Sequence, residues 1–102
     1  MAYSMETARC LMEGRMRDAA MGCAQARFDL GVAFSCGTGG VEVDLIEAHK
    51  WFNLAALAGS DEGQACRAEI ADEMTAREIA EAQRQARAWL ARTGRQTARL
   101  AA

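Results

Sequence analysis

Apolar residues in the first third of the chain recur at three- and four-residue steps, which places them on one face of an α-helix. In a first predicted helix, residues 4–20, this stripe consists of Met5, Ala8, Met12, Met16 and Ala19. In a second predicted helix, residues 23–36, it consists of Ala26, Leu30 and Phe34. Gly31 lets a neighbouring helix approach this second helix closely, and the glycine-rich stretch 37–40 ends it.

Capping residues mark two further helices. Asp44 is expected to cap a third helix, because its carboxylate can accept hydrogen bonds from free backbone N–H groups, and Gly59 ends this helix. Its broad apolar face consists of Leu45, Ala48, Trp51, Phe52, Ala55 and Ala56. Ser60 or Asp61 caps a fourth helix over about 61–73. The apolar stripe of that helix consists of Cys66, Ile70 and Met74.

A capping box from Thr75 to Glu78 is the clearest boundary signal and starts a fifth helix over about 76–92. Its buried stripe is predicted to consist of Ile79, Ala82, Ala86 and Trp89 or Leu90. Gly94 is expected to end the helix and to leave 95–102 as a short tail. The pattern predicts an all-α fold of about five helices, in which short links make consecutive helices antiparallel neighbours.

The composition agrees with closely packed helices and indicates the compartment. The chain has no proline and 51% apolar residues, but only 6% aromatic ones, so alanine must supply much of the packing. The start of the chain lacks a basic, apolar leader, and no run of about 18 apolar residues exists. We therefore expect a soluble, cytoplasmic protein without a membrane segment.

Residues 26–59 carry a longer spaced pattern. It consists of Ala26, Phe28, Leu30-Gly31, Phe34, the glycine loop with Val41, Asp44, Ala48, Trp51, Ala55-Ala56 and Gly59. This pattern resembles one unit of the Sel-one-like repeat family (SLR), a relative of the tetratricopeptide repeats. The resemblance implies a single helical-repeat domain over 1–102, with an N-terminal capping helix (4–22), one repeat unit (23–59), a degenerate second unit with a C-terminal capping helix (60–93), and a tail (94–102).

The second unit departs from the family pattern. Gly63 stands where an alanine is expected, and Arg67 stands where a leucine is expected. The pattern can slip so that Cys66 and Ile70 take the buried positions. The resemblance is therefore strong over about a third of the chain, and the ends are interpreted as caps of a short array.

The resemblance also implies a function. In tetratricopeptide-like arrays the hairpins stack as an α-α superhelix, and the first helix of each hairpin lines a concave groove. The residues expected to face this groove are Gln25, Phe28, Val32 and Ser35 and, one period of 37 residues later, Glu62, Ala65, Glu69 and Asp72. Such a groove is apolar at one end and acidic at the other, and it suits a peptide or helix with basic residues. We expect a protein–protein interaction module, although Phe28 is equally a core position.

Side chains for catalysis or metal binding are few. His49 is the only histidine and lies inside the third predicted helix, and no Cys-x-x-Cys motif exists. The four cysteines (Cys10, Cys23, Cys36 and Cys66) are expected to be free, and mostly buried as small apolar residues. Cys36, beside the glycine loop, is the candidate for exposure. The sequence indicates no enzyme, no metal site and no cofactor.

Charge is unevenly distributed along the chain. Residues 1–81 hold all 14 acidic residues and seven basic ones, whereas residues 82–102 hold only basic ones: Arg84, Arg87, Arg92, Arg95 and Arg99. This basic segment can be a solvated helix face or an arm that docks on another surface. Two other functions stay open: a homodimer formed through the end helices, and nucleic-acid binding through the arginines. Nucleic acid is the weaker hypothesis, because no aromatic residues are interleaved.

Overall fold

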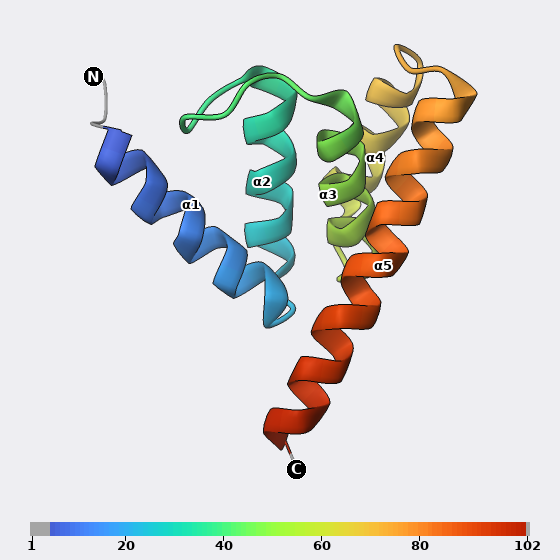
Figure 1. Cartoon of the computed structure of the whole chain (residues 1–102). Helices are drawn as coiled ribbons and strands as arrows, with labels where there is room; N and C mark the ends of the chain where they lie inside the picture. Colours follow the sequence, from blue (N-terminus) through green and yellow to red (C-terminus); the bar gives the residue numbers. More distant parts are fainter. Residues whose placement is uncertain (1–4, 102) are drawn as a thin grey trace.

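Five helices and no strand make up the part of the chain that the computed structural model describes, which is the backbone of residues 5–101 and the side chains of residues 6–94. The helices are α1 (Met5–Ala20), α2 (Ala24–Cys36), α3 (Leu45–Leu57), α4 (Asp61–Ala71) and α5 (Ala76–Ala101) (Figure 1). The predicted all-α fold of packed helical hairpins is confirmed. Residue 4, where the first helix was predicted to start, lies outside the described residues.

The predicted caps set the starts of three helices. Asp44 Oδ1 accepts a hydrogen bond from the backbone N–H of Glu47 at 3.1 Å, and Ser60 Oγ accepts one from Gly63 at 2.9 Å. Ser60, and not Asp61, is therefore the cap of α4. At the start of α5, the backbone N–H of Glu78 donates to Thr75 Oγ1, while the backbone N–H of Thr75 donates to the Glu78 carboxylate. The predicted capping box is confirmed.

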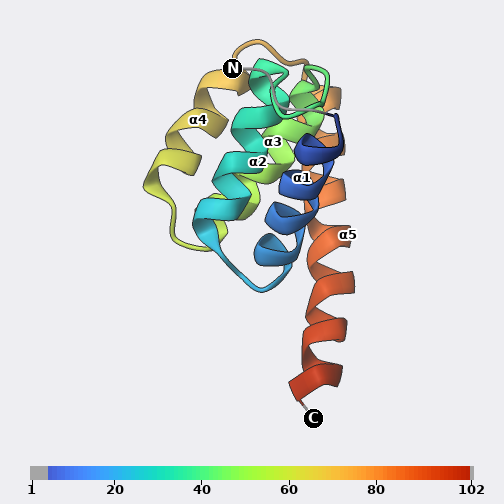
Figure 2. The same cartoon turned by 90° about the vertical axis from the view of Figure 1, so that its left-hand side faces the viewer.

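α3 is the central helix of the fold. It packs against α2, α4 and α5, whereas α1 packs against α2. Figure 2 shows α4 and α5 on opposite sides of the α2–α3 pair. Because the core is divided by this central helix, apolar side chains gather in two clusters, one on each side of it.

The first cluster lies between α1, α2, α3 and α5. Its buried members are Ala19, Ala26, Leu30, Trp51, Leu54 and Ala86, with Met12, Phe34, Trp89 and Leu90 partly buried against them. Trp51 is completely buried and meets Trp89 edge to face, with ring centroids 5.1 Å apart. The fully buried Leu54 was missing from the predicted apolar face of α3.

The second cluster joins α2 and α3 to α4. Ala48, Phe52 and Ile70 are buried, and Phe28, Val32, Phe34, Cys66 and Met74 are partly buried against them. Phe52 fits here because Gly31 has no side chain: a Cβ at that position would come within 2.5 Å of Phe52 Cδ1. The close approach of α2 and α3 predicted at Gly31 is therefore confirmed.

Arg27 connects four helices from the inside of the fold. Its side chain is only 8% exposed, and it donates hydrogen bonds to the backbone carbonyls of Ala19 (3.0 Å) and Leu54 (2.9 Å). Its guanidinium carbon lies 5.1 Å from the centroid of the Trp89 ring. Burial lowers the pKa of the Arg27 guanidinium, but an arginine keeps its charge at neutral pH. One buried cation thus links α2 to the ends of α1 and α3 and to α5.

The predicted end of the fifth helix is wrong, because α5 continues past Gly94 to Ala101. A glycine ends a helix readily when it adopts positive φ, as Gly37 does after α2 with φ 72°. Gly94 is not among the glycines with positive φ, and it simply remains a helical residue. Figures 1 and 2 show the C-terminal part of α5 extending beyond the other helices.

The expectation that most cysteines are buried is also wrong. Cys10, Cys23 and Cys36 are exposed, and only Cys66 is half-buried. Cys23 faces solvent because it is the N-cap of α2, where its Sγ accepts a hydrogen bond from the backbone N–H of Ala26 at 3.4 Å. The predicted methionine stripe of α1 is only partly buried, since Met16 is 39% exposed.

Gly31 and Gly94, both within helices, predict opposite effects of one substitution. Gly31→Ala should lower the free energy of unfolding by about 1–3 kcal/mol, because the new methyl group overlaps the Phe52 ring. Gly94→Ala should raise it by up to about 1 kcal/mol, because the position is helical and open to solvent. Urea unfolding followed by circular dichroism measures both changes. Equal effects of the two substitutions would contradict the close α2–α3 packing.

Removing the buried cation should be costly. Arg27→Ala is expected to lower the free energy of unfolding by roughly 2–4 kcal/mol, because two hydrogen bonds and the packing of the side chain are lost together. The matched control is Arg87→Ala, an exposed position on α5, which should change the value by less than about 0.5 kcal/mol. Thermal unfolding of the two variants provides the comparison.

Candidate partner-binding surfaces

The residues predicted to line a groove lie on one face of α2 and one face of α4. We call this surface the α2–α4 face: Gln25, Phe28, Val32 and Ser35 on α2, with Glu62, Ala65, Glu69 and Asp72 on or directly after α4. Phe28 and Val32 pack against the same buried cluster as Cys66 of α4. The two stripes therefore lie next to each other at their apolar positions, and the apolar half of the face is partly core.

The polar residues on α2 are occupied within their own helix. Gln25 Nε2 donates to Asp29 Oδ1 at 2.9 Å, and Ser35 Oγ donates to the Val32 carbonyl at 3.0 Å. Phe28 is half-buried, with its ring centroid 5.6 Å from that of Phe52. Among the α2 residues, the half-buried side chains of Phe28 and Val32 supply the apolar surface.

Acidic residues dominate the exposed surface of α4 and of the two residues that follow it. Asp61, Glu62, Glu69, Asp72 and Glu73 are all exposed, and within the described part of the chain none of them forms an ion pair. The one basic residue of α4, Arg67, donates a hydrogen bond to Asn53 Oδ1 at 2.6 Å and is half-buried. The side of α4 that faces solvent therefore carries uncompensated negative charge.

Cys66 lies between these carboxylates and the core. Burial raises the pKa of its thiol, and the charges of Glu69 and Glu62 raise it further. A thiol with a raised pKa forms little thiolate at neutral pH and is a poor nucleophile. Cys66 thus serves the α2–α4 face as an apolar contact.

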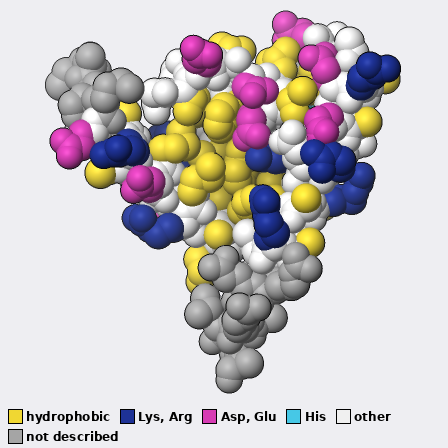
Figure 3. Space-filling model, viewed as in Figure 1, with side chains coloured by type: hydrophobic (Ala, Val, Ile, Leu, Met, Phe, Trp, Pro, Cys, Tyr) yellow, Lys and Arg dark blue, Asp and Glu magenta, His cyan; other side chains and the backbone are white. Residues whose placement is uncertain are grey.

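A second apolar surface lies on the other side of the molecule. Figure 3 shows hydrophobic side chains gathered between α1 and α5. The first core cluster has partly buried members on α1, α2 and α5, which are Met12, Phe34, Trp89 and Leu90. The sequence pattern did not predict this surface, because each of these residues was assigned to the core stripe of its own helix.

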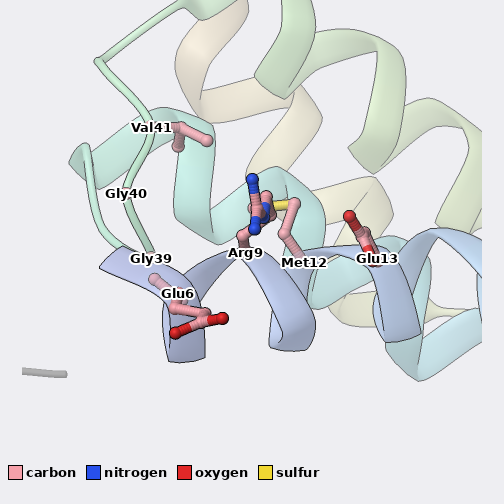
Figure 4. Close-up of a pocket in the computed structure, with 8 residues that line it drawn as sticks. Glu6, Arg9, Met12, Glu13, Gly39, Gly40 and Val41 are labelled. Carbon is pink, nitrogen blue, oxygen red and sulfur yellow. The ribbon is translucent and has the colours of Figure 1, made fainter. Parts of the chain in front are cut away.

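A pocket of about 520 Å³ lies between α1 and the glycine loop (Figure 4). It is lined by Glu6, Ala8, Arg9, Met12, Glu13, Gly39, Gly40 and Val41. The glycines of the loop have no side chains, so the space between the loop and α1 stays open. Figure 4 shows Arg9 and Met12 on the side of α1 that faces the loop. The glycine-rich pattern of this loop predicts the end of a helix and gives no signal of a pocket.

A basic hollow of about 240 Å³ lies between α3 and α5. It is lined by Lys50, Arg84, Gln85, Ala88 and Arg92. Lys50 and Arg84 form ion pairs with Glu47 (2.9 Å) and Glu81 (2.6 Å). Arg92 is exposed and forms no ion pair with any described residue. Three cations against two carboxylates leave this edge of the molecule positively charged.

His49 is buried and isolated. Its side chain is 3% exposed, and its Nδ1 atom has no hydrogen-bond partner among the described residues. Burial lowers the pKa of the imidazole below its ordinary value of 6.5, and the charge of Arg67 lowers it further. The described residues contain no group of three or more His, Cys, Asp or Glu side chains placed to hold a metal ion. His49 is thus a core residue that is neutral at pH 7.

Within the described residues, no helix combines the length and the apolar character that crossing a membrane requires. α5 is the longest helix, with 26 residues, but its exposed positions include Arg77, Arg84, Arg87 and Arg92.

The burial of His49 predicts a loss of stability in mild acid. Because the folded pKa lies below the unfolded one, the unfolded chain binds more protons between these two values. The free energy of unfolding should therefore decrease as the pH falls through 6.5, and it should level off below the folded pKa. The melting temperature of the wild-type chain, measured between pH 7.5 and 5.5, should fall more than that of His49→Asn. If the melting temperatures of the wild type and of His49→Asn fell equally with pH, the imidazole of His49, the only histidine in the sequence, would not be buried in its neutral form.

Comparison of the chain with protein-family models, with curated proteins and with solved structures found no match. The resemblance to the Sel-one-like repeats therefore rests on the spaced residues of 26–59 and stays a prediction.

Proposed function

We propose that this chain is a protein–protein interaction module whose α2–α4 face binds a basic segment of a partner protein. The observation that carries the proposal is the row of exposed, unpaired carboxylates on α4 beside the half-buried Phe28 and Val32. A partner helix can bury its own apolar side chains against this apolar strip. The carboxylates favour a partner helix that carries Lys or Arg residues beside those apolar side chains. The motif resemblance supports the same surface, since it assigns the groove to these helices.

The composition of the face suits recognition better than catalysis. Its polar groups are carboxylates, an amide and the Ser35 hydroxyl, which donates to the Val32 carbonyl. The thiol of the adjacent Cys66 is held in the protonated form, and Phe28 packs on Phe52. Such a surface provides charge and contact area but no activated nucleophile. We infer an adaptor role, in which affinity comes from apolar contact and specificity comes from charge.

Charge reversal on α4 tests the proposal. The probe is a fluorescently labelled helical peptide with arginines at three- and four-residue steps, and a version with glutamines in their place serves as the peptide control. Wild-type protein should bind the arginine peptide, and Glu69→Lys with Asp72→Lys should weaken binding at least about tenfold, since the surface of α4 loses its net negative charge. Fluorescence anisotropy measures both affinities.

The matched protein control carries the same change of charge elsewhere. Asp18→Lys with Glu42→Lys reverses two exposed carboxylates outside the α2–α4 face and should leave the affinity within about twofold. If both double variants bind the arginine peptide equally well, the α2–α4 face is not the binding surface.

A further inference from the structure

The α5 helix of this chain has the chemistry that the α2–α4 face is proposed to bind. From residue 82 onwards the chain carries five arginines and no acidic residue. Arg92 borders the basic hollow without an ionic partner among the described residues, and the sequence adds Arg95 and Arg99 to the part of α5 that extends beyond the other helices (Figure 1). The last part of α5 is therefore a helix whose charged residues are all arginines, and Arg92 among them is exposed.

This basic helix and the acidic face lie apart within one molecule. α4 and α5 both pack on α3, and Figure 2 shows them on opposite sides of the α2–α3 pair. The unpaired carboxylates of α4 and the unpaired Arg92 of α5 therefore do not neutralise each other inside one copy. Two surfaces of opposite charge at opposite edges favour contact between copies.

The spacing of the charges matches as well. Glu62 and Glu69 are seven residues apart on α4, and Arg92 and Arg99 are seven residues apart on α5. Seven residues are close to two helical turns, or about 10.5 Å along either axis. Two helices lying side by side can therefore bring both pairs of opposite charges together, whether they run parallel or antiparallel.

We propose that the partner of the α2–α4 face is the C-terminal part of α5 from a second copy of this chain. This inference rests on the proposed function of that face. One copy offers its acidic face and the next offers its basic helix, so the contact is head to tail. A head-to-tail contact leaves a free acidic face at one end and a free helix at the other, and it continues as a chain or closes as a ring. Ion pairs formed between helix surfaces in water contribute little, so the association is weak and sensitive to salt.

Sedimentation velocity of the full chain over a range of concentrations tests the self-association. The weight-average mass should rise with concentration, and the apparent affinity should fall on the order of tenfold when the salt is raised from low to high ionic strength. A wild-type chain that stays monomeric at every concentration would overturn the inference. Because the arginine-peptide assay does not depend on self-association, binding of that peptide by a monomeric chain would leave the proposed function standing.

A pair of charge-reversed variants tests the head-to-tail geometry. Glu62→Lys, Glu69→Lys and Asp72→Lys together make both surfaces basic, and Arg92→Glu, Arg95→Glu and Arg99→Glu together make the face and the C-terminal part of α5 both acidic, so each variant alone should be monomeric. An equimolar mixture should associate again, because each helix then meets a face of opposite charge. Asp18→Lys with Glu42→Lys is the control and should associate like the wild type. Association of either reversed variant alone, or no recovery in the mixture, would overturn the head-to-tail contact.

Discussion

The structure depends on one buried cation, Arg27, whose charge is compensated by backbone carbonyls and not by a carboxylate. Ala19 and Leu54 lie in the last turns of α1 and α3, where the carbonyl groups give a helix its negative end. Two helix ends therefore converge on one guanidinium, and Trp89 of α5 lies over it. Because an arginine side chain donates along fixed directions, this arrangement sets where α1, α3 and α5 lie relative to α2.

Close approach of the backbones is the second constraint, and small residues make it possible. Gly31 leaves space for the Phe52 ring. At Gly63, a Cβ atom would lie only 2.9 Å from Ala55 Cβ, so α4 can approach α3 only with a glycine there. With only 6% aromatic residues, two aromatic pairs, Trp51–Trp89 and Phe28–Phe52, fill the spaces on either side of α3. The division of the core into two clusters follows, since α3 lies between them and contributes to both.

Surface charge follows from the same arrangement. α4 covers the second cluster and turns its carboxylates to solvent, while α5 covers the first cluster and turns Arg84, Arg87 and Arg92 to solvent. Since these helices pack on different sides of the α2–α3 pair, the molecule is acidic at one edge and basic at another. The net charge of −2 does not reveal this separation of charge. A partner that contacts one edge interacts with the charge of that edge and not with the net charge. The proposed binding of basic helices and the proposed association between copies both derive from it.

The sequence by itself determined the five helices, the caps at Asp44 and Thr75, and the close approach at Gly31, because each depends on residues near one another in the chain; it left the cap of α4 open between Ser60 and Asp61. It also placed Trp51 and Ile70 in the core, since periodicity assigns a side chain to a face. Only the tertiary structure decided what depends on neighbours from other helices. Arg27 is a charged residue that the sequence pattern does not assign to the core. Its burial is possible because it donates hydrogen bonds to backbone carbonyls of two other helices. Gly94 does not end α5, because no neighbour or left-handed turn interrupts the helix there. The pocket beside the glycine loop and the apolar surface between α1 and α5 depend on how segments distant in the sequence pack, which no local pattern records.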